Sequence, residues 1–129
     1  RVAQNWCALL VLDGPLDSHA FQRAADALVE RHPMLRTVFP AGLRPPRQQE
    51  IVPGRSLPIP FEDLSGIADE AERRAAMHAR MQAERDVPFA VDRWPLVRMR
   101  LLRLGEARHA WLIAAHHLIG DGMSAWVLG

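Results

Sequence analysis

The sequence of 129 residues has few of the features that assign a protein to a class at once. Its single cysteine, Cys7, excludes an internal disulfide and a cysteine-based metal cluster within the chain. No stretch is long and apolar enough to span a bilayer, and the first residues lack the charged-then-apolar layout of a signal peptide. We therefore expect a cytoplasmic protein, with no membrane partner, in which Cys7 is a small buried residue of a strand.

Lysine is missing altogether, because all 16 basic residues are arginine. We interpret this bias, together with the many alanines and prolines, as the effect of a GC-rich coding sequence. The arginines are dispersed and the net charge is only +1. No concentrated positive face for a phosphate backbone is expected, so no nucleic-acid partner is predicted. A content of 49% hydrophobic and 24% charged residues is ordinary for one small globular domain.

The apolar pattern of the first half predicts a strand, a helix and a group of short strands. Residues 6–12 are a nearly continuous apolar run, and Asp17 or Ser18 then caps a helix that ends near Arg31 before Pro33. Three short strands are predicted at residues 34–39, 48–52 and 57–61. The helix should bury one stripe, which consists of Phe21, Ala24, Ala25, Leu28 and Val29.

The second half predicts a helix, a hairpin and a loop. The helix covers residues 67–85, with Asp69/Arg73 and Glu70/Arg74 spaced for ion pairs. Residues 96–104 alternate apolar residues with arginine, which predicts one buried and one wet face, and they pair with residues 108–115. A loop over residues 116–122 leads to a helix that begins in residues 123–128. The predicted class is a mixed α/β or α+β fold, with a mixed β-sheet flanked by helices.

Two adjacent histidines, His116 and His117, follow the last apolar strand and precede a loop with two glycines. Side chains alternate along a strand, so the two imidazoles should point to opposite faces. A neutral imidazole is well suited to take a proton from an amine or hydroxyl. Asp121 could orient a histidine or pair with an arginine. Equally, the histidines could be hydrogen-bonded core or rim residues, and Asp121 a turn former before Gly122.

Two other chemistries fit these residues poorly. Adjacent histidines on a strand point apart and chelate one ion badly, and neither His78 nor His109 is spaced to help, so no metal is predicted. A serine hydrolase is not favoured because the sequence lacks a GxSxG elbow. Ser124 is better interpreted as a helix cap or a polar lining residue.

The stretch after the last strand resembles the condensation domains of nonribosomal peptide synthetases, whose signature is HHxxxDG. The matching residues are His116-His117-Leu118-Ile119-Gly120-Asp121-Gly122. Three further stretches match in the family's order, with Ala90 and Trp94 as departures. They are Gly14-Pro15-Leu16-Asp17, the run from Leu28 to Phe39 that contains RHPMLRTVF, and Pro88-Phe89 followed by Pro95-Leu96-Val97-Arg98.

The resemblance implies one lobe of a chloramphenicol-acetyltransferase-like two-lobed fold, with the active site in a tunnel between the lobes. It implies that His117 is the catalytic residue and that His116, Asp121 and Gly122 support the active-site loop. The Gly122 amide is then a candidate oxyanion donor. Asp121 is expected to form a structural salt bridge to Arg31, with Arg36 as the alternative.

The activity implied is amide-bond formation between a carrier-bound acyl or peptidyl thioester and a carrier-bound aminoacyl acceptor. No cofactor is expected to bind directly, and the phosphopantetheine arms of donor and acceptor peptidyl carrier proteins would deliver the substrates. Adjoining adenylation and carrier domains are further expected partners. The alternatives are an O-acyltransferase or epimerisation domain of the same fold, a non-catalytic recruitment module, and an unrelated α/β domain.

The motif that opens such domains is expected before this chain, and a C-terminal lobe after it. Residues 1–129 are therefore expected to be an N-terminal lobe, a fragment that is inactive when isolated.

Overall fold

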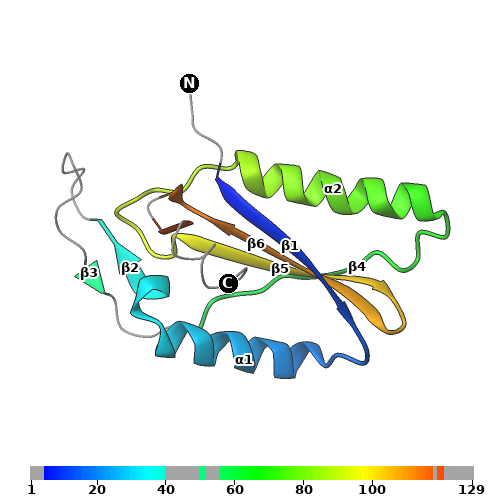
Figure 1. Ribbon diagram of the computed structural model, residues 1–129, viewed down its shortest axis with the longest axis horizontal. Coiled ribbons are helices and arrows are strands. Elements are labelled where there is room, and N and C mark those ends of the chain that lie inside the picture. The colour runs from blue at the N-terminus through cyan, green and yellow to red at the C-terminus, as the bar shows by residue number, and fades with distance from the viewer. Residues whose placement is uncertain (1–4, 40–49, 52–55, 118, 121–129) are drawn as a thin grey trace.

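The fold is a four-stranded sheet between two helices, with a two-stranded sheet at one end (Figure 1). This computed structural model describes residues 5–39, 50–51, 56–117 and 119–120. Its elements are β1 (Trp6–Asp13), α1 (Ser18–Arg31), the 3₁₀ helix η1 (Pro33–Arg36), β2 (Thr37–Val38), β3 (Glu50–Ile51), β4 (Phe61–Asp63), α2 (Glu70–Asp86), β5 (Val97–Gly105) and β6 (Arg108–Ala115).

The main sheet has the strand order β1-β6-β5-β4. The β5–β6 hairpin is antiparallel as predicted, β1 adds antiparallel to β6, and β4 lies parallel to β5 at the other edge. Helices α1 and α2 lie on opposite sides of this sheet (Figure 1). The predicted class, a mixed sheet flanked by helices, is therefore confirmed.

The face of the sheet beneath α1 carries the larger apolar core. Val97, Met99 and Ile113 lie in one cluster with Ala25 and Val29 of α1. They share a face because side chains alternate along a strand and recur every three or four residues on a helix. The predicted stripe of α1 is only partly correct, because Ala24 is exposed.

The opposite face of the sheet corrects a prediction. The arginines of β5 were expected to face solvent, yet α2 lies over them, and Glu84 of α2 pairs with both Arg98 and Arg100. Alternation of apolar and charged residues is typical of a half-exposed strand, but a carboxylate supplied by a covering helix satisfies the same pattern. Only a small apolar cluster, built on Leu64, Leu102 and Ala110, accompanies these ion pairs.

The helix boundaries follow from their caps. Asp17 caps α1 as predicted, since its carboxylate accepts a hydrogen bond from the His19 amide at 2.9 Å. Helix α2 begins three residues later than predicted, because Asp69 is its N-cap and accepts from the Glu72 amide at 2.9 Å. Asp69 therefore serves the backbone, whereas the predicted Glu70–Arg74 pair is present at 3.7 Å.

The short segments between the helices differ most from their predictions. Residues 34–39 were expected to be a strand, but Pro33 begins η1, and only Thr37–Val38 is extended, as β2. Proline fits the first position of a helical turn because it has no amide to satisfy there. Residues 48–52 contain β3, which pairs with β2. The segment predicted at 57–61 pairs only from Phe61 onward, after Pro58 and Pro60.

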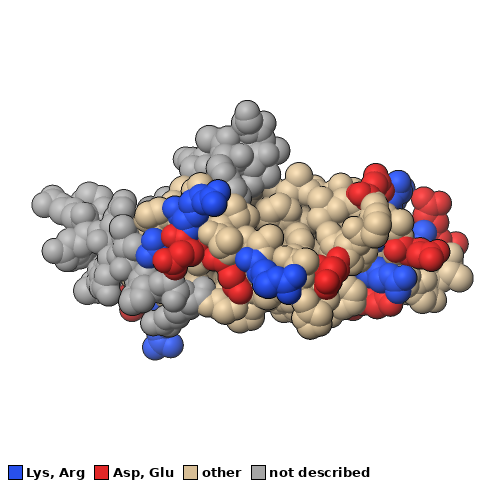
Figure 2. Space-filling view, turned by 90° about the horizontal axis from the view of Figure 1, so that it is seen from below, with Lys and Arg blue, Asp and Glu red and all other residues tan. Residues whose placement is uncertain are grey.

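Charges of both signs are interleaved on the face viewed from below, the side of α1 (Figure 2). In the described part of the chain, no helix is long and apolar enough to cross a bilayer.

Candidate active site

Strand β6 places the histidine pair at its carboxyl end. The amide of His116 donates to the Leu96 carbonyl at 3.0 Å, and its own carbonyl accepts from the amides of Ile119 at 3.0 Å and Gly120 at 2.8 Å. The chain therefore enters a helical turn at His117, so the prediction of a loop over residues 116–122 is wrong at His117, Ile119 and Gly120. Ile119, which is only 4% exposed, joins the core beneath α1 and holds this turn against the sheet.

The two imidazoles occupy different environments. His117 is exposed, whereas His116 is partly buried and lies edge-on to the ring of Phe89, with centroids 6.5 Å apart and planes at 71°. Burial lowers the pKa of His116, and a positive charge on His117 lowers it further. Both effects favour the uncharged form of His116, and His117 is the more exposed of the two imidazoles.

Gly120 allows the helical turn to lie directly on β1. A Cβ at this position would be 2.8 Å from the Cβ of Trp6 and 3.2 Å from its Cγ. Every residue except glycine carries a Cβ, so no ordinary substitution at position 6 would remove the closest contact. The glycine that precedes Asp121 thus sets the distance between the turn and the sheet.

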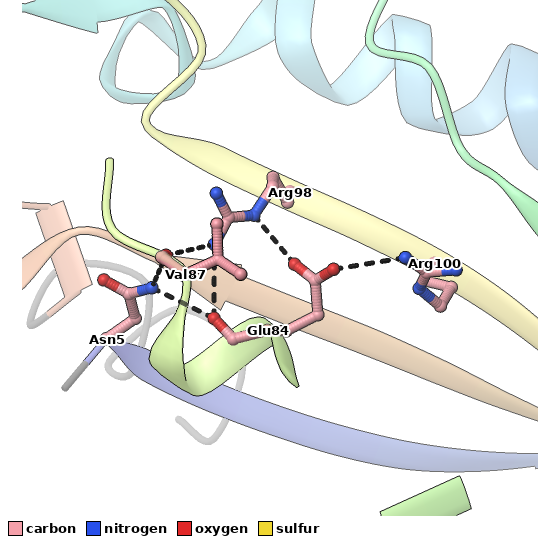
Figure 3. Close-up of polar contacts among 5 residues, drawn as sticks. All are labelled: Asn5, Glu84, Val87, Arg98 and Arg100. Atoms are coloured by element: carbon pink, nitrogen blue, oxygen red, sulfur yellow. Dashed lines mark hydrogen bonds and ion pairs between the residues drawn. The ribbon is translucent and has the colours of Figure 1, made fainter. Parts of the chain in front are cut away.

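A polar network lies where the C-terminal end of α2 meets the first residues of β5 (Figure 3). The Arg98 guanidinium contacts the Glu84 carboxylate at 2.7 Å and donates to the carbonyls of Glu84 at 3.2 Å and Val87 at 2.6 Å. The Asn5 side-chain amide donates to the same two carbonyls, at 3.0 and 2.5 Å. Together these groups satisfy carbonyls that a helix end leaves without intrahelical partners.

Sequence reasoning assigned no role to Phe89 or Arg98. The Arg98 guanidinium carbon lies 3.9 Å from the centroid of the Phe89 ring, and the same ring contacts His116. Both residues belong to motif stretches that carried the resemblance, and this was the available signal. The contact between them depends on how a loop folds over β5, which residue spacing does not reveal.

Several predicted site residues lie outside the described part of the chain, namely Asp121, Gly122, Ser124 and the helix expected in residues 123–128. Of the two candidate partners of Asp121, Arg31 is exposed in the last turn of α1. Arg36 is partly buried, and its guanidinium donates to the carbonyls of Val29 at 3.0 Å and Glu30 at 3.2 Å. The salt bridge to Asp121 stays a prediction.

Two surface hollows border α2 and lie away from His116 and His117. One of about 740 Å³ is lined by one side of α2 between Asp69 and His78, and one of about 340 Å³ also includes Val11, Leu104 and Arg108. Neither is lined by His116 or His117. Among the described residues, no group of three or more histidine, cysteine or acidic side chains is arranged to hold a metal ion.

Comparison with protein families adds a decisive observation. The family model described as "Condensation domain" matches residues 2–129. The chain belongs to the condensation-domain family. The resemblance found in its motifs is thereby confirmed.

Known members of the family are similar along nearly the whole chain. Chondramide synthase cmdD of Chondromyces crocatus is 40% identical over 126 residues, which are 98% of this chain and 3% of that protein. Phosphinothricin tripeptide synthetase PhsC of Streptomyces viridochromogenes is 37% identical over 129 residues, 99% of this chain and 12% of that protein. The chain therefore spans only a small part of the synthetases that it resembles.

Solved condensation domains share the fold. The starter condensation domain of rhizomide synthetase RzmA superposes with a TM-score of 0.79 at 25% identity, covering 95% of this chain and 29% of that one. This likeness confirms the predicted chloramphenicol-acetyltransferase-like fold.

Proposed function

We propose that residues 1–129 are the N-terminal lobe of a condensation domain that forms amide bonds in nonribosomal peptide synthesis, with His117 as its catalytic residue. The observation that carries this proposal is the position of His117. It is an exposed imidazole at the start of a helical turn, beside a partly buried His116 whose pKa is lowered by burial, in a chain of the condensation-domain family. The synthetase relatives support the same function.

The reaction needs one proton acceptor and good positioning. The amine nitrogen of the acceptor attacks the thioester carbonyl of the donor, the carbon–sulfur bond breaks, and the donor's thiol leaves. His117 takes the proton that the amine nitrogen loses, and this proton balances the one that the departing thiolate needs. A thioester is already activated, so orientation supplies much of the rate enhancement. One general base adds typically ~10²–10⁴-fold.

The remaining residues of the loop are given supporting roles. His116 holds the loop, Asp121 anchors it through a salt bridge, and Gly122 lets the backbone approach the substrate. The partial burial of Arg36 favours it over the exposed Arg31 as the partner of Asp121. Arg31→Ala and Arg36→Ala distinguish the two, because loss of the true partner of Asp121 should lower both the transfer rate and the melting temperature.

The partners follow from the substrates. We propose that donor and acceptor peptidyl carrier proteins present their thioesters on phosphopantetheine arms, with adenylation domains adjoining, in the cytoplasm. The chain covers 29% of the solved starter condensation domain. We therefore propose that the second lobe completes the tunnel and that residues 1–129 are inactive alone.

A transfer assay with the intact two-lobed domain tests the function. A carrier-bound acyl donor and a carrier-bound aminoacyl acceptor are supplied, and the product on the acceptor carrier is identified by intact mass. Amide that forms with wild type and with His78→Gln, an exposed histidine of α2, but falls by about a hundredfold or more in His117→Ala, is the expected result. Undiminished amide formation by His117→Ala, or ester formation only when an alcohol is supplied, would overturn the proposal.

A further inference from the structure

The ring of Phe89 contacts both the Arg98 guanidinium and the His116 imidazole. We propose that Phe89, held by Arg98, is a positioning residue that fixes His116 and through it the placement of His117. This inference rests on the catalytic role proposed for His117. Phe89 and Arg98 would thus contribute to catalysis without touching the reacting atoms.

Arg98 is itself held in place by its protein contacts. Its guanidinium has three protein acceptors, which are the carboxylate of Glu84 and the backbone carbonyls of Glu84 and Val87. The side chains of Arg98 and Glu84 are 28% and 13% exposed, so water screens this pair only in part. A planar guanidinium with this many partners has little freedom to rotate.

Phe89 in turn contacts two partners with its ring. The guanidinium carbon of Arg98 lies 3.9 Å from the ring centroid, within the range of a cation–π contact. The imidazole of His116 lies 6.5 Å away in a T-shaped arrangement at 71°. Phe89 also packs against the apolar core beneath α1, which limits its own movement.

The segment that contains Leu96 and Arg98 contacts the main chain of His116 directly and its side chain through Phe89. The Leu96 carbonyl accepts the His116 amide at 3.0 Å, and Arg98, two residues further on, positions the ring that contacts the His116 imidazole. The main chain and the side chain of His116 are thus both positioned by the segment where β5 begins. A shift of His116 would move His117, its immediate neighbour.

The same contacts also affect the pKa of His116. Among the described residues, the charged groups near these contacts include Arg98 on β5, Glu84 on α2 and His117 itself. Glu84 neutralises Arg98 directly. Burial lowers the pKa of His116 and so favours its uncharged form, and an uncharged neighbour does not oppose the uptake of a proton by His117.

The test uses the intact two-lobed domain with both carrier proteins. Phe89→Leu removes the aromatic ring, Phe89→Tyr retains it, and Phe61→Leu is the matched control. Phe61 contacts another histidine, His109, at 6.4 Å, at the opposite end of β6. We expect Phe89→Leu to lower kcat by about tenfold to a hundredfold, with KM for the acceptor carrier within about twofold of wild type. Phe89→Tyr should restore the rate, and Phe61→Leu should leave it unchanged.

A spectroscopic readout separates positioning from general damage. The titration of His116 is followed by NMR with labelled histidine and assigned with His116→Gln. Phe89→Leu should shift this titration toward higher pH and change the pH profile of kcat, whereas a merely structural loss would leave the pH profile unchanged. If Phe89→Leu does not fold, Arg98→Gln replaces it, with Arg80→Gln as the control, and a nuclear Overhauser contact between the Phe89 and His116 rings is sought in wild type.

The two proposals fail in different ways. If His117→Ala abolishes transfer while folded Phe89→Leu keeps the wild-type kcat and His116 titration, the positioning role is wrong and the function stands. Absence of the ring–ring contact in wild type would also overturn the positioning role. If His117→Ala retains full transfer, the proposed function is wrong, and any effect of Phe89 on catalysis cannot act through His117.

Discussion

The two faces of the main sheet are held in different ways. Beneath α1, Val97, Met99 and Ile113 pack on a large apolar cluster, so this contact depends on buried area. Beneath α2, the contact depends on a small cluster and on Glu84, which binds Arg98 and Arg100. A strand with arginines at alternate positions can therefore be covered on both faces. The contacts of Glu84 lie at the end of the sheet that carries His116 and His117, whereas Arg80 of α2 binds Glu62 of β4.

The largest effect is expected on the α1 face. Ile113 is 0% exposed at the centre of the larger cluster, so Ile113→Ala should lower the free energy of unfolding by about 2–5 kcal/mol, because it leaves a cavity. Met77→Ala, on the partly buried side of α2, should cost less than about half as much. Denaturant unfolding of the intact domain measures both. Equal losses would show that the two faces do not differ in packing.

Gly120→Ala should have the next largest effect. The added methyl group would lie 2.8 Å from the Cβ of Trp6, so the turn or β1 must move, at a cost of about 1–3 kcal/mol. The transfer rate should fall as well, since His117 belongs to the same turn. Gly66→Ala is the matched control, because no atom lies within 4 Å of its added Cβ. A Gly120→Ala domain with wild-type stability would contradict the close packing of turn and strand.

Glu84→Gln tests the polar contact of the α2 face. It removes the charge between Arg98 and Arg100, and we expect a loss of about 1–3 kcal/mol in the free energy of unfolding. Glu62→Gln is the matched control, because its pair with Arg80 at 2.7 Å is more exposed and should contribute less than about 1 kcal/mol. Chemical denaturation at low and high salt measures the free energy of unfolding of both variants. A larger loss for Glu62→Gln would contradict the stronger contribution of the Glu84 pairs.

Some features of the fold and the site could be predicted from the sequence, and others could not. The β5–β6 hairpin and the Asp17 cap could be predicted, because periodicity and capping are local properties of the chain. The covering of Arg98 and Arg100 could not, since it depends on Glu84 from a distant helix. The motif located His116 and His117, yet the helical turn was missed, because two glycines suggested a loop whereas Ile119 is buried in the core.

A smaller effect is expected from His109, at the beginning of β6. Burial lowers its pKa, the charge of Arg103 lowers it further, and Asp63 partly opposes both. The folded state therefore binds a proton less readily than the unfolded state, and stability should be lost as pH falls below about 6.5. His109→Gln should weaken this loss, with His78→Gln as the exposed control. Melting temperatures across mildly acidic pH test this, and an unchanged pH dependence would contradict it.

The smallest effect is expected at the outer side of α2. Arg74 pairs with Glu70 at 3.7 Å, and both side chains are largely exposed. Arg74→Ala should therefore change the free energy of unfolding by no more than about 0.5 kcal/mol. Denaturant unfolding beside Glu84→Gln provides the measurement. A loss as large as that of Glu84→Gln would mean that exposed and partly buried pairs contribute alike.

The pairing of β1 with β6 bears on how the chain folds as it is synthesised. Trp6 is opposite Ala115, so the first strand must wait for nearly the whole chain before its partner leaves the ribosome. The β5–β6 hairpin joins residues close in sequence and can form quickly, whereas closure by β1 has a high contact order. Until then the apolar segment WCALLVL lacks a partner strand and is prone to aggregate. We therefore expect chaperone dependence in the cell to centre on β1.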